Sequence, residues 1–195
     1  MCIRDRSGSA CVVAILGVTG RTGPAVARAF SGAVRGLSRR APHADERVPE
    51  GITLAQADRR DVDALAALVD GADAVIDLVG FSRDDADALL AAVARATRPP
   101  RHLVFASSIA VNYPDDPVGR GKREARARYE EGFVGTVHTL VLPRLVASVD
   151  HARRERPYLD TARATGKALV EGDGAQRQTV ASVEGVAAVI RAAPR

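Results

Sequence analysis

The feature that most constrains this chain of 195 residues is a glycine-rich turn directly after a short apolar run. Residues 12–16 are all apolar, and the run is too short and too closely bounded by glycine for a helix, so it predicts a buried β-strand. The turn that follows reads Gly17-Val18-Thr19-Gly20-Arg21-Thr22-Gly23. Pro24 then opens a predicted helix. Because this order of strand, glycine turn and helix brings backbone amides and a helix N-terminus to a pyrophosphate, it predicts a Rossmann-type dinucleotide site.

The rest of the chain continues the alternation of short apolar runs and amphipathic segments. Strands are predicted at residues 12–16, 34–38, 52–57, 75–79, 102–106 and 136–142, and helices at residues 24–30, 61–69, 84–96, 121–131 and 183–193. This alternation favours an α/β fold, a Rossmann-type doubly wound parallel sheet with helices on both faces, in one domain over residues 11–195. Residues 1–10 show no periodicity and are expected to be a non-native or disordered leader, and residues 146–177 are the least readable part.

Composition excludes several classes of protein. The 46% hydrophobic and 27% charged residues are typical of a globular domain, and no apolar run approaches the roughly 20 residues of a membrane helix, so a cytoplasmic protein is expected. The net charge of +4 suggests nucleic acid, but the basic residues are dispersed and aromatics make up only 4%, so no nucleic-acid partner is expected. Neither the two cysteines nor the four histidines have metal-ligand spacing, and no metal is expected.

The turn and several later motifs, in order, resemble the extended and atypical short-chain dehydrogenase/reductases, the NAD(P)-dependent epimerase/dehydratase group. Those motifs are Ala57-Asp58-Arg59-Arg60-Asp61, Gly71-Ala72-Asp73-Ala74-Val75-Ile76, Leu103-Val104-Phe105-Ala106-Ser107-Ser108, residues 172–177 and residues 183–187. The resemblance implies hydride transfer on a small carbonyl or nucleotide-sugar substrate. It also implies a homodimer through the helices that follow the fourth and fifth strands. Relatives continue into a C-terminal lobe that builds the substrate pocket, and this lobe is expected to be largely missing because the chain stops at Arg195.

The end of the second strand predicts which dinucleotide is bound. NAD-preferring sites place a carboxylate there, whereas this chain has Ser38, Arg39 and Arg40, whose hydroxyl and guanidinium groups suit a 2′-phosphate. Arg21 of the glycine turn is expected to join them. NADP is therefore the predicted cofactor, with NAD as the alternative if Arg39 and Arg40 are merely solvated.

Three further cofactor contacts are expected at the ends of the third and fourth strands. The resemblance places the carboxylate of Asp58 at the adenine amino group. Val79 and Gly80 end the fourth strand, where a small residue lets the cofactor lie close to the backbone.

The resemblance also implies three catalytic groups: a serine that polarises the substrate oxygen, a lysine that holds the nicotinamide ribose, and a tyrosine four residues before the lysine that transfers the proton. Ser108 and Lys122 match the first two, with a backbone-capping serine and a surface lysine as the alternatives. Val118 stands in the tyrosine position. Either Tyr113 reaches the site from its loop, or the usual proton donor is missing and the chain is a non-catalytic NADP(H)-binding redox sensor or regulator.

Overall fold

The computed structural model of the chain describes residues 11–39, 50–147, 156–167, 173, 175 and 177–193. Arg40 and residues 1–10 lie outside these ranges, so what the sequence predicts for them stays a prediction. The strands are β1 (Val12–Leu16), β2 (Ala33–Ser38), β3 (Ile52–Gln56), β4 (Ala74–Asp77), β5 (His102–Ser108), β6 (Thr136–Leu142), β7 (Arg144–Val146) and β8 (Val180–Ser182). The helices are α1 (Gly23–Ala29), α2 (Val62–Val69), α3 (Arg83–Arg95), the 3₁₀ helix η1 (Ile109–Asn112), α4 (Pro117–Gly132), α5 (Arg156–Thr165) and α6 (Val183–Ala192).

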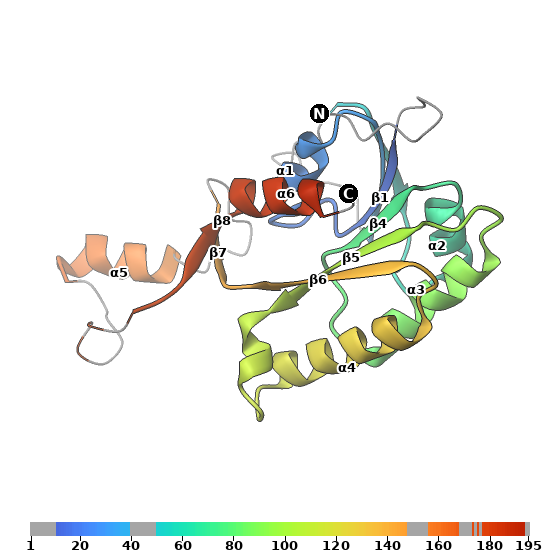
Figure 1. Cartoon of the computed structure of the whole chain (residues 1–195). Helices are drawn as coiled ribbons and strands as arrows, with labels where there is room; N and C mark the ends of the chain where they lie inside the picture. Colours follow the sequence, from blue (N-terminus) through green and yellow to red (C-terminus); the bar gives the residue numbers. More distant parts are fainter. Residues whose placement is uncertain are drawn as a thin grey trace.

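Six parallel strands form one sheet in the order β3-β2-β1-β4-β5-β6. Helices α1 and α6 cover one face of this sheet, and α2, α3 and α4 cover the other (Figure 1). The order reverses between β1 and β4, which is where an open α/β sheet leaves a crevice at the carboxyl ends of its strands. The predicted doubly wound Rossmann-type sheet is therefore confirmed.

Because both faces of the sheet are covered, the central strands are apolar on both sides. In β1, Ala14 and Leu16 face the core under α2, α3 and α4, while Val13 and Ile15 face the core under α1 and α6. All four are at most 1% exposed. This double burial explains why the sequence shows a continuous apolar run here instead of an alternating pattern.

Helix α4 begins four residues earlier than the sequence predicts. Asp116 caps it by accepting a hydrogen bond from the Gly119 N–H (2.7 Å), and Pro117 occupies the first helical position, where a missing N–H costs nothing. Lys122 therefore lies in the second turn of the helix and not at its opening.

At the two ends of the least readable stretch of the sequence, residues 146–177, the chain forms a second, small sheet. Strands β7 and β8 pair in parallel over three residues each, and α5 lies between them in the chain. Figure 1 shows α5 and the two strands projecting from the end of the main sheet. Three-residue strands are too short to produce a period in the sequence. Among the helices that the structure describes, none combines the length and apolar character that crossing a membrane requires.

Replacing Gly23 by alanine tests the close packing of α1 on the first turn. A Cβ at Gly23 would overlap the carbonyl oxygens of Gly17 and Val18, which are backbone atoms that cannot rotate away. We expect Gly23→Ala to lower the free energy of unfolding by about 2 kcal/mol or more in equilibrium denaturant unfolding. Gly185→Ala is the matched control, because a Cβ there meets only the Ser182 hydroxyl at 3.2 Å and alanine favours a helix, so stability should be unchanged or should rise by up to about 1 kcal/mol. Equal losses in the two variants would contradict this account.

Candidate functional site

The glycine turn leaves the carboxyl end of β1 and enters α1. Gly17 has a left-handed φ of 85°, and its N–H points at the Leu37 carbonyl oxygen (3.4 Å). The Gly20 N–H donates to the Gly17 carbonyl (3.0 Å) and closes the turn. Thr22 is the N-cap of α1, yet its side chain makes no capping hydrogen bond. The first amides of α1 are therefore left without a side-chain acceptor, an arrangement that suits an anion.

A cavity of about 670 Å³ lies at the carboxyl ends of β1 to β4. Its volume is within the range of roughly 300–1,000 Å³ that is usual for ligand pockets. It is lined by Leu16, Gly17, Thr19, Gly20, Leu37, Ser38, Arg39, Ala57, Asp58, Arg59, Arg60, Val79, Phe81 and Asp85. The structure thus brings residues of the glycine turn, the β2 end and the β3 end to one cavity.

The end of the cavity at β2 combines two hydroxyls and a guanidinium. The side chains of Thr19 and Ser38 are buried, and their hydroxyl oxygens are 2.8 Å apart in a hydrogen bond. The Ala57 N–H donates to the Ser38 carbonyl (3.1 Å), which holds the end of β3 against the end of β2. Arg39 follows Ser38 at the exposed rim.

Arg21 is directed away from this group. Its Nη1 donates to the carbonyl oxygen of Leu145 in β7 (2.8 Å), and Arg21 is not among the residues that line the cavity. The sequence predicts that Arg21 joins Ser38 and Arg39, but the structure does not bring these residues together. Its guanidinium instead links the glycine turn to the small sheet. Arg40, the other arginine expected here, lies outside the described residues.

The residues expected at the ends of β3 and β4 are placed differently from one another. Asp58 lines the cavity, and its Oδ1 accepts a hydrogen bond from the Arg60 N–H (2.8 Å), so one carboxylate oxygen stabilises the β3–α2 turn. Val79 also lines the cavity. Gly80 is buried and is not among the lining residues, and a Cβ there would overlap the carboxylate of Asp77, so this glycine makes room for a protein group.

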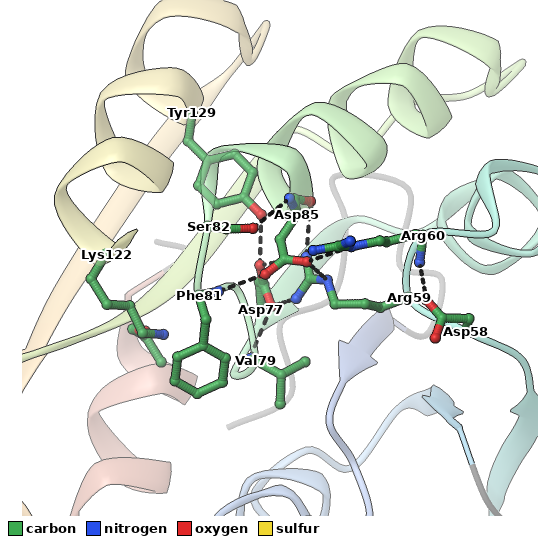
Figure 2. Close-up of polar contacts among 11 residues, drawn as sticks. Asp58, Arg59, Arg60, Asp77, Val79, Phe81, Ser82, Asp85, Lys122 and Tyr129 are labelled. Atoms are coloured by element: carbon green, nitrogen blue, oxygen red, sulfur yellow. Dashed lines mark hydrogen bonds and ion pairs between the residues drawn. The ribbon is translucent and has the colours of Figure 1, made fainter. Parts of the chain in front are cut away.

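A fully buried carboxylate, that of Asp77 at the end of β4, contacts Arg59 and Val79, two residues that line the cavity (Figure 2). Arg59 binds both of its oxygens, Nη1 to Oδ1 at 3.0 Å and Nη2 to Oδ2 at 3.3 Å. The Tyr129 hydroxyl donates to Oδ2 (2.6 Å) and the Val79 N–H donates to Oδ1 (3.0 Å). Each carboxylate oxygen therefore has two donors, which compensates for its removal from water.

A second carboxylate, Asp85 in the first turn of α3, holds the other side of Arg59. Arg59 Nη2 donates to the Asp85 carbonyl (2.9 Å), and the Nε atoms of Arg59 and Arg60 lie 3.3 and 3.4 Å from Asp85 Oδ1. The Phe81 N–H donates to Oδ2 (2.9 Å). Burial opposes ionisation of Arg59, but the Asp77 carboxylate outweighs it and raises the pKa of Arg59 above its usual value. Burial likewise opposes ionisation of Asp85, and the Phe81 N–H and Arg59 outweigh it, so the pKa of Asp85 is lowered.

Tyr129 belongs to this buried network. Its ring packs edge-on against Phe105 with the ring centroids 5.2 Å apart, and the side chain is fully buried. Burial first, and then the neighbouring Asp77 carboxylate, raise the pKa of Tyr129 well above its usual value. The hydroxyl therefore keeps its proton and serves as a fixed donor to Asp77.

Lys122 is also buried, at 3% exposure. Its Nζ donates to the Ala106 carbonyl of β5 (2.6 Å) and lies 4.2 Å from the ring centroid of Phe81 and 4.9 Å from that of Phe105. Burial lowers the pKa of Lys122 to about 8, with the Asp77 carboxylate opposing the shift. The Lys122 side chain therefore changes between its ammonium and amine forms at a pH of about 8. Because it is buried, it is not the surface lysine that the sequence allows as an alternative.

The other expected catalytic groups lie near the carboxyl end of β5 with different exposure. Ser108, the last residue of β5, is half-buried and accepts a hydrogen bond from the Ala110 N–H (3.2 Å). Tyr113 follows η1 and its side chain is 61% exposed. Val118, one helical turn before Lys122, is 44% exposed and has no proton to give. The structure therefore brings Ser108 and Lys122 to the same end of β5 and leaves Tyr113 on an exposed loop.

Sequence reasoning missed the buried network and the aromatic ring beside Lys122. The missed residues are Arg59, Asp77, Phe81, Asp85 and Tyr129. One signal was present, because an aspartate inside the apolar run at residues 75–79 would be buried and would need a partner. That partner could not be chosen among the 28 lysines and arginines of the chain without the tertiary structure.

Comparison with known proteins adds a family and a set of similar folds. The profile of a family described as NAD(P)H-binding matches residues 17–133. No curated protein matches the sequence. Among solved structures, the fold is similar to the enzyme WbmH of Bordetella bronchiseptica with NAD⁺ (13% identity, TM-score 0.77, covering 94% of this chain and 72% of that one). It is also similar to a dTDP-glucose 4,6-dehydratase of Streptomyces venezuelae with NAD (16% identity, TM-score 0.75, covering 92% of this chain and 70% of that one). A third similar structure is a short-chain dehydrogenase/reductase of Veillonella parvula with NADP (17% identity, TM-score 0.65, covering 92% of this chain and 85% of that one).

Removing the Tyr129 hydroxyl should weaken the buried network. In Tyr129→Phe, Oδ2 of Asp77 loses its shortest hydrogen bond while the ring packing is kept. We expect the free energy of unfolding to fall by about 1–3 kcal/mol in denaturant unfolding, the cost of an incompletely satisfied buried carboxylate. Tyr158→Phe, on the exposed face of α5, makes the same chemical change and should leave stability within about 0.5 kcal/mol of wild type. A loss in Tyr158→Phe as large as that in Tyr129→Phe would contradict the assignment.

Nuclear magnetic resonance can measure the titration of Lys122 directly, since Lys167 is the only other lysine in the chain. With ¹³C-labelled lysine, one resonance should titrate with a pKa of about 8, and it should disappear in Lys122→Met. Asp77→Asn should lower this pKa further, because the Asp77 carboxylate favours the ammonium form. An unchanged or raised pKa in Asp77→Asn would show that Asp77 does not act on the lysine.

The same titration affects stability with a defined sign. The pKa of Lys122 is about 8 in the folded protein, below its ordinary value of 10.5, so the unfolded state binds more protons between these pH values. The free energy of unfolding of the wild type, measured relative to Lys122→Met, should therefore rise as the pH increases from about 8 to 10.5.

Proposed function

The chain belongs to the NAD(P)H-binding family, and on this premise we propose that it is an NADP-dependent oxidoreductase or epimerase/dehydratase that acts on a small carbonyl or nucleotide-sugar substrate by hydride transfer. When bound, the nicotinamide supplies the hydride. The chain's own residues bind and orient the cofactor, hold the substrate oxygen and manage the proton.

The residues present fit a dinucleotide. Two features of the turn suit a pyrophosphate: the helix α1 begins without a side-chain cap, and Gly17 and Gly20 keep side chains away from the amides. At one end of the cavity Ser38 and Arg39 face the position of an adenosine ribose, and at the other Val79 and Phe81 lie at the end of β4. The cavity therefore extends to both sides of the switch point between β1 and β4, which is consistent with the proposed ligand.

The preference for NADP rests on one observation: Ser38 and Arg39 stand at the end of β2, where an NAD site would hold a carboxylate. Ser38 is fixed by its hydrogen bond to Thr19, and Arg39 lies exposed at the rim of the cavity. A guanidinium and a hydroxyl together bind a 2′-phosphate through charge-assisted hydrogen bonds. The unphosphorylated ribose of NAD offers these groups no negative charge.

At the carboxyl end of β5 we assign roles to three groups. Ser108 accepts a backbone hydrogen bond through its oxygen, which leaves its own proton to donate to a substrate oxygen. Lys122 holds the nicotinamide ribose, and its proton moves readily because its pKa is about 8. Tyr113 donates or accepts the substrate proton from the loop after η1.

A second function, binding NADP(H) without catalysis to report redox state to a partner, is favoured by Val118. This valine occupies the position one turn before Lys122 from which a tyrosine would transfer the proton. Consumption of NADPH with any member of a panel of small carbonyl compounds would support the enzyme, and Lys122→Met and Tyr113→Phe should then lose turnover. If both variants kept full turnover, the two catalytic assignments would be wrong.

The choice of cofactor can be tested by titrating NADPH and NADH separately and following their fluorescence. We expect NADPH to bind more tightly, and Arg39→Gln to weaken NADPH binding by about ten- to a hundredfold while it changes NADH binding little, because only NADPH carries the 2′-phosphate. Arg28→Gln, an exposed arginine in the last turn of α1, is the matched control and should alter neither affinity. Equal affinities of the wild type for the two cofactors would contradict the NADP preference, and failure to bind either would contradict the proposed function.

A further inference from the structure

The ring of Phe81 lies at the edge of the cavity and also contacts the buried ammonium group of Lys122. Phe81 is 51% exposed and lines the cavity, while Lys122 Nζ lies over its ring at 4.2 Å from the centroid. Figure 2 shows the ring projecting from the segment after β4, with the Lys122 side chain on one side. One aromatic side chain therefore contacts a cation and also faces the ligand space.

The backbone of Phe81 is held in place by two different elements. Its N–H donates to Oδ2 of Asp85 in α3 (2.9 Å). Its carbonyl oxygen packs so closely on α4 that a Cβ at Gly121 would overlap it. The ring is therefore attached to a fixed point at the edge of the cavity.

The ammonium group of Lys122 is held equally firmly. Its Nζ donates to the Ala106 carbonyl (2.6 Å), and the Phe105 ring lies on another side at 4.9 Å to its centroid. At 3% exposure the cation has almost no water to screen it. The electric field of the Lys122 ammonium group therefore acts on any ligand group that packs against the other face of the Phe81 ring.

The position of Phe81 along the cavity indicates which part of a dinucleotide it meets. Ser38 and Arg39 line the end at β2, and Gly17 and Gly20 line the middle at the switch point of the sheet. A dinucleotide crosses such a switch point with one nucleotide on each side. With the phosphorylated adenosine at β2, the nicotinamide half lies on the β4 side, where Phe81 stands.

We propose that Phe81 and Lys122 together make this site distinguish the reduced from the oxidised cofactor, so that it binds NADPH more tightly than NADP⁺. The inference rests on the proposed binding of a nicotinamide dinucleotide. The oxidised nicotinamide ring carries a positive charge and the reduced ring is neutral. An aromatic face attracts a cation, but here a cation already occupies one side of the ring and repels a second one at the other.

The surrounding charges do not cancel that of Lys122. Of the carboxylates that act on it, Asp77 is matched by Arg59, and Asp85 is shared by Arg59 and Arg60. Tyr129, which donates to Asp77, keeps its proton and adds no charge. The lysine therefore contributes a net positive charge below its own pKa of about 8 and loses it above. The preference for NADPH over NADP⁺ should accordingly be larger at about pH 7 than at about pH 9.

The experiment measures dissociation constants of three probes by calorimetry: NADPH, NADP⁺ and adenosine 2′,5′-bisphosphate, which lacks the nicotinamide half. For the wild type at about pH 7 we expect NADPH to bind about three- to thirtyfold more tightly than NADP⁺, the range that a cation roughly 8 Å away produces at intermediate to high dielectric. In Lys122→Met the preference should fall to within about twofold. Adenosine 2′,5′-bisphosphate should bind wild type and variant alike, which shows that the cavity is intact.

Two further variants sharpen the test. Lys167→Met makes the same chemical change at an exposed lysine and should keep the full preference. Phe81→Leu keeps an apolar side chain but removes the aromatic face, so it should weaken binding of NADPH and NADP⁺ and leave adenosine 2′,5′-bisphosphate unaffected.

Each outcome has a definite meaning. NADP⁺ binding as tightly as NADPH in the wild type, or a preference that survives in Lys122→Met, would overturn the inference while leaving the proposed function standing. Binding of adenosine 2′,5′-bisphosphate without any difference between the wild type and Phe81→Leu for NADPH would show that the ring does not meet the nicotinamide half. Failure of the wild type to bind all three probes would overturn the proposed function itself.

Discussion

The structure around the site depends on one buried charge, the carboxylate of Asp77. Removing an ion of this size from water costs several kcal/mol unless it is paired and hydrogen-bonded. Asp77 meets this requirement with donors from three different parts of the chain: Arg59 from the β3–α2 turn, Tyr129 from α4, and the Val79 N–H from the β4–α3 segment. Because each donor is needed, these three parts are held at fixed positions relative to the end of β4.

Because Arg59 is held in a fixed position, it also fixes residues that line the cavity. Arg59 is also bound by Asp85, and Asp85 in turn holds the backbone of Phe81 and contacts Arg60. The side of the cavity that faces α3 is thus one connected set of ion pairs and hydrogen bonds. A ligand that enters meets a preformed surface, so little of its binding energy is lost in ordering side chains.

The opposite side of the cavity is shaped by the absence of side chains. The turn that begins at Gly17 approaches Val79 so closely that a Cβ at Gly17 would lie 2.6 Å from a Val79 methyl group, and Gly36 leaves room for Val18. The chain can follow this path only because these positions are glycine. One side of the cavity is therefore held by ion pairs and hydrogen bonds, and the other side is formed by backbone that packs closely because it carries glycines.

The fold could be predicted almost entirely from the sequence, because its signals are local. The apolar run of β1, the glycine spacing, and the capping aspartate of α2, whose Oδ1 accepts from the Asp63 and Ala64 N–H groups, depend on residues within a few positions of one another. The same is true of the residues of the glycine turn and of Ser38 and Arg39, which follow directly from the end of a predictable strand. The sequence pattern predicts the start of α4 four residues late because it does not reveal the cap at Asp116, and β7 and β8 are too short to show a period.

Only the tertiary structure decided which distant charges meet. Asp77 and Tyr129 are 52 residues apart, and Arg59 and Asp85 are 26 apart, so no spacing rule links them. The same holds for Arg21, which a local pattern assigned to a phosphate and which packing directs to Leu145. The sequence by itself therefore determined the six strands of the main sheet, the glycine turn and the class of ligand, since these follow from short-range sterics and hydrogen bonding. The three-dimensional packing determined the buried charge network and the setting of Lys122, because the energy of a charge away from water depends on every group around it, whatever their separation along the chain.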